Sequence, residues 1–432
     1  MVSIADASAT DASQEDVFLA DASVEADATI ATDSGALVPV WEKDIARYPG
    51  GFSFVSDVAV DPNNRVIATG SCRTDTSEPC QVLGNGFGGY DLGLGNESGN
   101  VFVVSYDAAG TPLWDKVWTA TTKHVSPYVT TDAAGNVFVA MNVTGSIDFG
   151  GGARTLSNEL VLASYDKAGA YRWDRVVPSN SELGEITVRS IVGGPLDEIV
   201  ISGVSDTWDG IVLALGPSGV TRWAKSAEGT PLVAYGNVQS VGIDSNGRVI
   251  TLGRYDDPTG SAFLASWAST GSLEWEAAPG PLDLELVVDG TDIFTAGGAN
   301  LTRRTSNRAI VYSVTIAQAP QCSSGICMPL PFAVSPAYDE LWYAVGATQS
   351  TIVRRKKSDG SGATSWTPAF GPLDPSMWPY PSSGTLRGPG PPRKMVVMPQ
   401  GDIVATSGTG ILVNGNLLSG SVGRLTRFAR PN

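Results

Sequence analysis

The chain has 432 residues, of which 50 are glycine and 27 proline; only 17% are charged, and 11 Trp, 12 Tyr and 12 Phe are present. Many turn formers and aromatic side chains with few charges predict an all-β fold of short strands, and no apolar run approaches the roughly 20 residues of a transmembrane helix. The net charge of −16 argues against nucleic-acid binding as the main task, because phosphate contacts need clustered cations.

Residues 1–35 are rich in Ala, Asp and Ser and carry eight acidic side chains and no basic one. Such a composition buries too little apolar surface to offset the entropy of ordering, so we expect a disordered linker ahead of a single domain at 36–432. Neither a basic stretch nor an apolar stretch follows Met1, so we expect that an export signal has been removed or left out. Acidic tethers of this kind are typical of surface lipoproteins, although residues 1–35 contain no cysteine to carry a lipid.

Repeated hairpins fill the rest of the chain. "SYDAAGTPLWDKVW" at 105–118 recurs 59 residues later as "SYDKAGAYRWDRVV", and a strand–turn–strand segment precedes each copy. Asp and Gly in the turns suit tight hairpins, since Asp caps its own backbone and Gly accepts a positive φ. Seven such hairpins are expected, at 57–71, 128–142, 189–203, 240–254, 285–298, 332–346 and 395–408.

Each hairpin is followed by a third strand and usually by a fourth that contains a tryptophan: Trp114, Trp173, Trp223, Trp275 or Trp366. A four-stranded unit of about 45–60 residues cannot bury its faces alone, so we predict a seven-bladed β-propeller of antiparallel blades. We expect the repeated tryptophans to pack between blades and not to form a binding row. Blade five is the least regular, because no Trp follows its "RAIVYSVTIAQAP".

The two ends of the domain predict how the ring closes. Trp41, in "VPVWEKDIARY", lies on a tryptophan strand with no preceding partner strands, whereas the chain ends on a third-strand copy, "GRLTRFARPN". The N-terminal strand is therefore expected to complete the last blade and leave no open sheet edge.

"VTTDAAGNVFVAMNVTGSIDFGGG" at 129–152, followed by "ELVLASYDKAGAYRWDRVV", resembles the bacterial seven-bladed β-propeller repeat family of SBBP type. The resemblance covers about residues 36–432 and implies an exported or cell-surface protein without an assigned active site. The repeat is also similar to the Asp-x-x-x-Gly-x-x-x-Trp motif of quinoprotein-like propellers. Those enzymes need calcium, a carboxylate base and in some cases adjacent cysteines. Here no two cysteines are adjacent, and no metal-binding carboxylate set is identified.

The four cysteines form two local pairs, Cys72 with Cys80 and Cys322 with Cys327. Neither pair has the doubled C-x-x-C spacing or the histidine partners of a zinc site. Two short disulfides are therefore expected, which indicates an oxidising compartment; four free thiols are the alternative.

No motif in the chain predicts a catalytic residue, a cofactor or a metal ion. "GNGFGG" at 84–89 is expected to lie in a loop. A nucleotide-binding fingerprint requires instead a preceding strand and a following helix. The loop that starts at Asp244 ends on Tyr255 where a calcium loop has glutamate. His124 is the only histidine, and no G-x-S-x-G elbow is present. A pair of carboxylates meeting across a cleft, as in glycosidases, stays open.

Two long loops, at 72–99 and 367–392, are candidates for binding, with decorative loop variation as the alternative. The candidate binding residues in and near them are Trp378, Tyr380, Arg354, Arg355, Lys356, Arg393 and Lys394. We predict a non-enzymatic interaction module for a protein or glycan, using these loops and the axial face. The alternatives are a quinoprotein-like or carbohydrate-cleaving enzyme and an inert spacer. An enzyme requires a convergent polar cluster with perturbed ionisation in the axial pocket.

Overall fold

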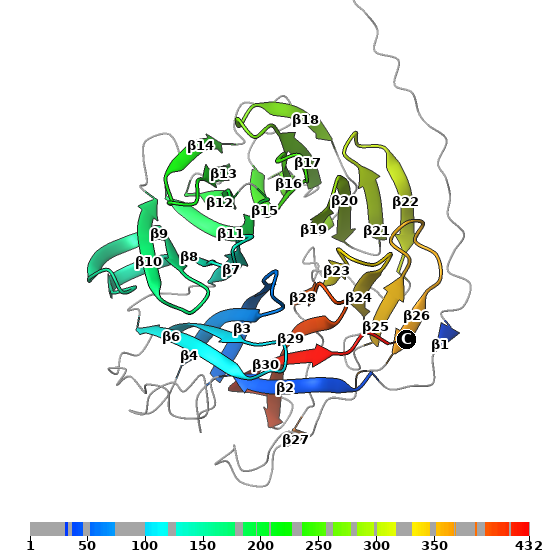
Figure 1. Ribbon diagram of the computed structural model, residues 1–432, viewed down its shortest axis with the longest axis horizontal. Coiled ribbons are helices and arrows are strands. Elements are labelled where there is room, and N and C mark those ends of the chain that lie inside the picture. Colours follow the sequence, from blue (N-terminus) through cyan, green and yellow to red (C-terminus); the bar gives the residue numbers. More distant parts are fainter. Residues whose placement is uncertain are drawn as a thin grey trace, which may run out of the picture.

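The computed structural model describes residues 31–32, 37–45, 52–73, 100–119, 127–177, 185–195, 197–206, 209–226, 236–255, 262–277, 283–297, 300–316, 331–345, 351–366, 368, 385–386, 394–413 and 416–431. These residues form seven antiparallel sheets arranged as blades around a central axis (Figure 1). The predicted seven-bladed β-propeller is therefore confirmed. No helix capable of crossing a membrane occurs within the described ranges.

The first four blades follow the chain in order. Blade one contains β3 (Phe52–Val60), β4 (Val66–Arg73), β5 (Asn100–Tyr106) and β6 (Pro112–Thr119). Blade two contains β7 (Tyr128–Thr131), β8 (Val137–Ile147), β9 (Arg154–Tyr165) and β10 (Tyr171–Val177). Blade three contains β11 (Ile186–Gly193), β12 (Ile199–Ser205), β13 (Gly210–Leu215) and β14 (Thr221–Ser226). Blade four contains β15 (Gly236–Ile243), β16 (Val249–Tyr255), β17 (Ala262–Trp267) and β18 (Leu273–Ala277).

The remaining blades continue the ring. Blade five contains β19 (Asp283–Asp289), β20 (Asp292–Gly297), β21 (Asn300–Thr305) and β22 (Ile310–Thr315). Blade six contains β23 (Phe332–Val334), β24 (Leu341–Val345), β25 (Thr351–Arg355) and β26 (Thr364–Trp366). Blade seven contains β28 (Lys394–Val397), β29 (Ile403–Val413), β30 (Asn416–Phe428) and β2 (Pro39–Ile45), with β27 (Thr385–Leu386) also paired to β29. The first strand of each blade lies nearest the axis (Figure 1).

Strand β2 closes the ring, as predicted. It pairs antiparallel with β30, so that Trp41 lies opposite Arg427, and the first and last strands of the domain share one sheet. Arg424 reinforces this pairing, because its guanidinium binds Asp44 at 2.6 Å and Glu42 at 3.3 Å. A strand from one end of the chain thus fills the outer position in the blade built by the other end.

A short strand lies within the segment 1–35 that the sequence predicts to be a linker. Strand β1 (Ala31–Thr32) pairs in parallel with β26 at the outer edge of blade six. A second parallel bridge joins Leu37 to Pro368. The chain therefore contacts blade six before it enters blade seven as β2.

The repeated Gly and Trp dock neighbouring blades. Trp114 of blade one lies on Gly169 of blade two, where φ is +81° and a Cβ atom would stand 2.6 Å from the indole. The indole Nε1 donates a hydrogen bond to the Lys167 carbonyl at 3.2 Å. The same stacking is formed by the pairs Trp41 on Gly110, Trp173 on Gly219 and Trp223 on Gly271. The predicted packing of the tryptophans between blades is confirmed.

Blade five is complete although its outer strand has no tryptophan. Tyr312 of β22 takes that place: its ring lies on Gly360 of blade six, and its hydroxyl donates to the Lys357 carbonyl at 3.1 Å. Toward blade four, Arg308 takes the turn position that a glycine occupies in other blades, with a φ of 73°. Its guanidinium lies over the ring of Trp275 in blade four. The irregularity that the sequence shows is therefore a change of side chains within an unchanged sheet.

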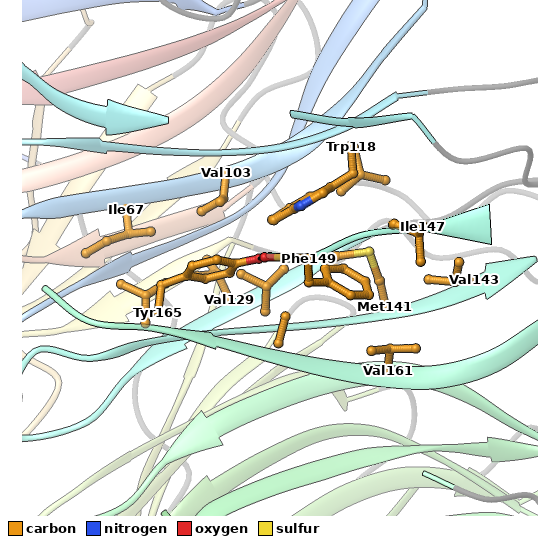
Figure 2. Packing of buried hydrophobic residues seen from close by; sticks show 14 of the residues in the cluster. Ile67, Val103, Trp118, Val129, Met141, Val143, Ile147, Phe149, Val161 and Tyr165 are labelled. Carbon is orange, nitrogen blue, oxygen red and sulfur yellow. The ribbon is translucent and has the colours of Figure 1, made fainter. Parts of the chain in front are cut away.

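Apolar side chains are buried between adjacent blades. Figure 2 shows one such cluster, in which Ile67 and Val103 of blade one meet Met141, Val161 and Tyr165 of blade two. Because each blade buries its faces against its neighbours, the apolar core forms a ring around the axis. The inner strands can therefore present polar side chains toward the axis.

Candidate functional site in the axial cavity

Bulges at the same point of four inner strands shape the axis. Strands β3, β11, β15 and β19 each shift register by one residue, and the residues that follow the shift are Asp57, Ser190, Ser240 and Glu285. A bulge bends a strand and redirects the next side chains. The four blades thus present polar side chains toward the axis from equivalent positions.

A cavity of 580 Å³ lies on the axis and is lined by residues of six blades, namely blades one to five and seven. This volume falls within the range that is typical of small-molecule sites, roughly 300–1,000 Å³. The charged side chains in its lining are Asp57, Arg189, Arg254, Glu285 and Lys394. The lining also contains Tyr128, Gln239 and several serines. Donors and acceptors therefore converge on one space.

Lys394 is the centre of an acidic environment inside this cavity. Its Nζ lies 3.7 Å from Oε2 of Glu285. The negative charge of Glu285 raises the pKa of Lys394 to about 12, with a smaller contribution from Asp57, although burial acts in the opposite direction. Lys394 is therefore a fixed cation whose charge the two carboxylates offset.

Asp57 is the most buried carboxyl of the cavity, with 7% of its surface exposed. Burial raises its pKa, while Lys394 and a hydrogen bond from the Val129 amide, at 3.0 Å, act to lower it. This hydrogen bond joins blade one to blade two. Burial and the charge of Asp57 likewise raise the pKa of the neighbouring Tyr128.

Arg254 and Arg189 have no acidic partner among the described residues. Nε and Nη2 of Arg254 are both buried and without a hydrogen-bond partner there, and burial lowers the pKa of this guanidinium. Arg189 is exposed on β11, at the bulged position of blade three. The cavity thus carries two carboxylates against three cationic side chains, and only one of the cations is paired.

The residues predicted from sequence to bind a partner lie in separate environments. Lys394 lines the axial cavity. Arg354 lies 5.1 Å from the centre of the Trp366 ring and donates to the Pro431 carbonyl at 3.1 Å, so it joins blades six and seven. Arg355 is only 4% exposed and donates to the Tyr343 hydroxyl and the Gly360 carbonyl. Lys356 is exposed.

Arg354 and Arg355 are therefore engaged within the fold, away from the cavity that contains Lys394. Trp378, Tyr380 and Arg393 lie outside the described residues, and their part in binding stays a prediction. Cys72 is buried in β4, whereas Cys80, Cys322 and Cys327 lie outside the described ranges, so the two disulfides also stay predictions. Within the described ranges no group of three His, Cys, Asp or Glu side chains is placed to hold a metal ion.

The sequence analysis missed most of the cavity residues, although a signal for them exists. Asp57, Tyr128 and Lys394 each stand four residues before the first residue of a hairpin turn, as Asp57 does before Asp61, and Glu285 stands four residues before the end of β19. Reading the aligned hairpins column by column would show polar or charged residues at one position of otherwise apolar inner strands. Arg254 has no such signal, because it lies at the end of a second strand.

The raised pKa of Asp57 predicts how stability depends on pH. A carboxyl whose pKa is higher in the folded state stabilises the fold below its unfolded pKa of about 3.9 and loses that contribution as pH rises. Asp57→Asn does not titrate. We therefore expect the free energy of unfolding of the wild type, measured relative to the variant by urea titration, to fall as the pH rises above about 4. A difference that does not change with pH would contradict this assignment.

Comparisons with known proteins leave the chain without an assigned family. No protein-family description matches it, and no curated protein is similar to it in sequence. The resemblance to SBBP-type repeats is thus not supported beyond the propeller fold itself.

Solved structures share the general architecture at low similarity. A protein of unknown function from Dyadobacter fermentans DSM 18053 is 11% identical over 90% of this chain and 99% of its own, with a TM-score of 0.47. Sqt1 of Saccharomyces cerevisiae is 9% identical over 92% and 99%, with a TM-score of 0.47. BamB of Moraxella catarrhalis is 13% identical over 78% and 94%, with a TM-score of 0.38. Similarities this low carry no argument about function, and the fold rests on the chain's own strand pairing.

Proposed function

We propose that this propeller is a non-enzymatic interaction module that holds a protein or glycan partner at its axial face. The observation that supports this proposal is the cavity of 580 Å³, which six rigid blades line with converging polar groups. Binding sites on a rigid scaffold need few structural changes on association, which lowers the entropic cost of binding. The cavity opening is the natural place for one protruding group of a larger partner.

The charges of the cavity favour binding over catalysis. Lys394 forms an ion pair with Glu285, and the Asp57 carboxyl group accepts a backbone hydrogen bond that joins two blades. These three side chains therefore have partners within the scaffold. Arg254 and Arg189 are the groups left to interact with a partner.

Export to an oxidising compartment is part of the same proposal. Pairing of Cys72 with Cys80 and of Cys322 with Cys327 would staple two loops, and such bonds persist outside the reducing cytosol. The acidic segment 1–35 would act as a tether between the propeller and its point of attachment.

The test is to block the cavity while leaving the blades intact. Ser190 lines the cavity and is half-buried, so Ser190→Trp would place an indole inside it. Thr187→Trp, at an exposed position of the same strand that does not line the cavity, is the matched control. Both variants and the wild type would be compared on an array of surface glycans and by in-cell cross-linking to protein partners.

We expect Ser190→Trp to weaken binding of the captured partner at least about tenfold, because the partner's inserted group and the indole cannot share one space. Thr187→Trp should bind as the wild type does. Unchanged binding by a folded Ser190→Trp protein would contradict the axial site.

A carbohydrate-cleaving enzyme is the second candidate, favoured by one observation. Asp57 and Glu285 face the same cavity, and burial raises the pKa of Asp57, as a general acid requires. Release of reducing ends from polysaccharides by the wild type and not by Asp57→Asn would favour this candidate. If neither protein releases reducing ends, the carbohydrate-cleaving activity is excluded for the substrates tried.

A further inference from the structure

The lining of the axial cavity has an excess of cationic groups. Among its described residues, two carboxylates face three cationic side chains, and the two carboxylates lie in the field of Lys394. The cations without a carboxylate partner among the described residues lie on the side of the cavity formed by blades three and four. These two blades contribute Arg189 and Arg254, and their strands β11 and β15 are adjacent.

Arg254 is the most unusual of these cations. It is the second-to-last residue of β16 and lies opposite Asn237 of the inner strand β15. Its buried Nε and Nη2 have no hydrogen-bond partner among the described residues. A buried charged donor that lacks a partner is costly, because it has lost its hydration without a replacement. The lowered pKa of the guanidinium agrees with uncompensated burial.

The shape of the unsatisfied group selects its ligand. The guanidinium of Arg254 lines the cavity and is a planar donor group, which suits a carboxylate. Arg189 is exposed and lines the same cavity, so it can attract an incoming anion. Asp57 and Glu285 line the same cavity, and carboxyl groups beside the ligand disfavour an anion with more than one charge.

We propose that Arg254 binds the single carboxylate of a hydroxylated small molecule, such as a uronic acid, inside the axial cavity. Gln239, Ser190 and Ser240 lie in the same lining and can bond to the hydroxyl groups of the ligand. The acid can be free or the end of an acidic glycan. In the second case the inference rests on the proposed function and specifies its glycan partner.

Isothermal titration calorimetry of the full chain tests this proposal, with sodium glucuronate as the probe and glucose as its uncharged analogue. We expect glucuronate to bind and glucose to bind at least about tenfold more weakly, because only the acid pairs with the guanidinium. A terminally glucuronylated oligosaccharide that binds more tightly than glucuronate would identify a glycan end as the source. Equal affinities would identify the free acid.

Arg254→Gln should weaken glucuronate binding about tenfold to a hundredfold, and Arg254→Lys should lie between it and the wild type. Arg222→Gln, at an exposed arginine of β14 outside the cavity lining, is the matched control and should bind as the wild type does. The melting temperature of Arg254→Gln should not fall, because the lost group is an uncompensated buried cation. If Arg254→Gln does not melt cooperatively, Arg254→Lys takes its place in the comparison with the wild type.

The result that would overturn the proposal is equal binding of glucuronate by the wild type and Arg254→Gln, or no binding by either. The outcome is separable from that of the proposed function. If glucuronate does not bind while Ser190→Trp still weakens partner binding, the axial interaction site stands without a carboxylate ligand. If glucuronate binds and Ser190→Trp leaves the partner unaffected, the small-molecule site stands alone.

Discussion

Trp41→Ala is expected to lower the free energy of unfolding by about 3–5 kcal/mol, the usual cost of truncating a buried Trp. Trp41 is 8% exposed, although it precedes every blade in the chain. Its ring lies 6.0 Å from that of Tyr106 and against Gly110, and its Nε1 donates to the Ala108 carbonyl at 3.1 Å. These contacts join blade seven to blade one, so their loss opens the junction at which the ring closes.

Urea unfolding followed by circular dichroism measures this effect. Trp41→Phe keeps an aromatic ring on the glycine and loses the indole donor, so it should cost less than the alanine variant. Val40→Ala changes the adjacent residue, which is 48% exposed, and should shift the free energy of unfolding by no more than about 0.5 kcal/mol. If Trp41→Ala resembles Val40→Ala, strand β2 does not hold the ring closed.

Tyr165→Ala is expected to have an effect of similar size, about 3–5 kcal/mol, because it leaves a large void in a packed aromatic cluster. Tyr165 is fully buried in blade two, with its ring 6.3 Å from that of Trp114 and 5.9 Å from that of Trp118. Figure 2 shows Tyr165 and Trp118 within this cluster. Its hydroxyl donates to the Phe149 carbonyl at 2.9 Å. One side chain thus connects the outer strand of blade one with the corner at Phe149 of blade two.

Tyr165→Phe separates packing from hydrogen bonding. It retains the ring and leaves the Phe149 carbonyl without this donor, so the expected loss is about 1–2 kcal/mol. Differential scanning calorimetry of the wild type and the two variants would measure the stability lost with the hydrogen bond and the further stability lost with the ring. A phenylalanine variant as unstable as the alanine variant would mean that the hydrogen bond, and not the aromatic packing, dominates at this position.

The blades could be predicted from sequence because their signals are local. An Asp-x-x-Gly turn between two apolar strands is readable within 15 residues, and its repetition implies a ring. The same reasoning explains why blade five is the least regular in sequence. Tyr312 packs on Gly360 as the tryptophans do on their glycines, but a search for Trp does not detect it. Similarly, Arg308 occupies a left-handed turn position at which other blades have glycine, so a search for glycine does not find this turn.

Candidate binding residues were harder to predict, since adjacency in sequence says little about a shared surface. Arg354 and Arg355 are neighbours in a basic run, yet one lies between two blades and the other is buried within its own. Consecutive strand residues point to opposite faces, so a run of charges in a strand divides between two environments. Lys394, chosen for its nearness to a long loop, instead lies on the axis.

The sequence by itself determined the class of fold, the number of blades and the closure by the N-terminal strand, because turn chemistry and strand alternation act over a few residues and recur along the chain. Only the tertiary structure decided which side chains share the axial cavity. Asp57, Arg189, Arg254, Glu285 and Lys394 are separated by up to 337 positions and meet because each blade places its inner edge on the axis. Closing the ring brings these charges together, and their pairing leaves Arg254 for a ligand.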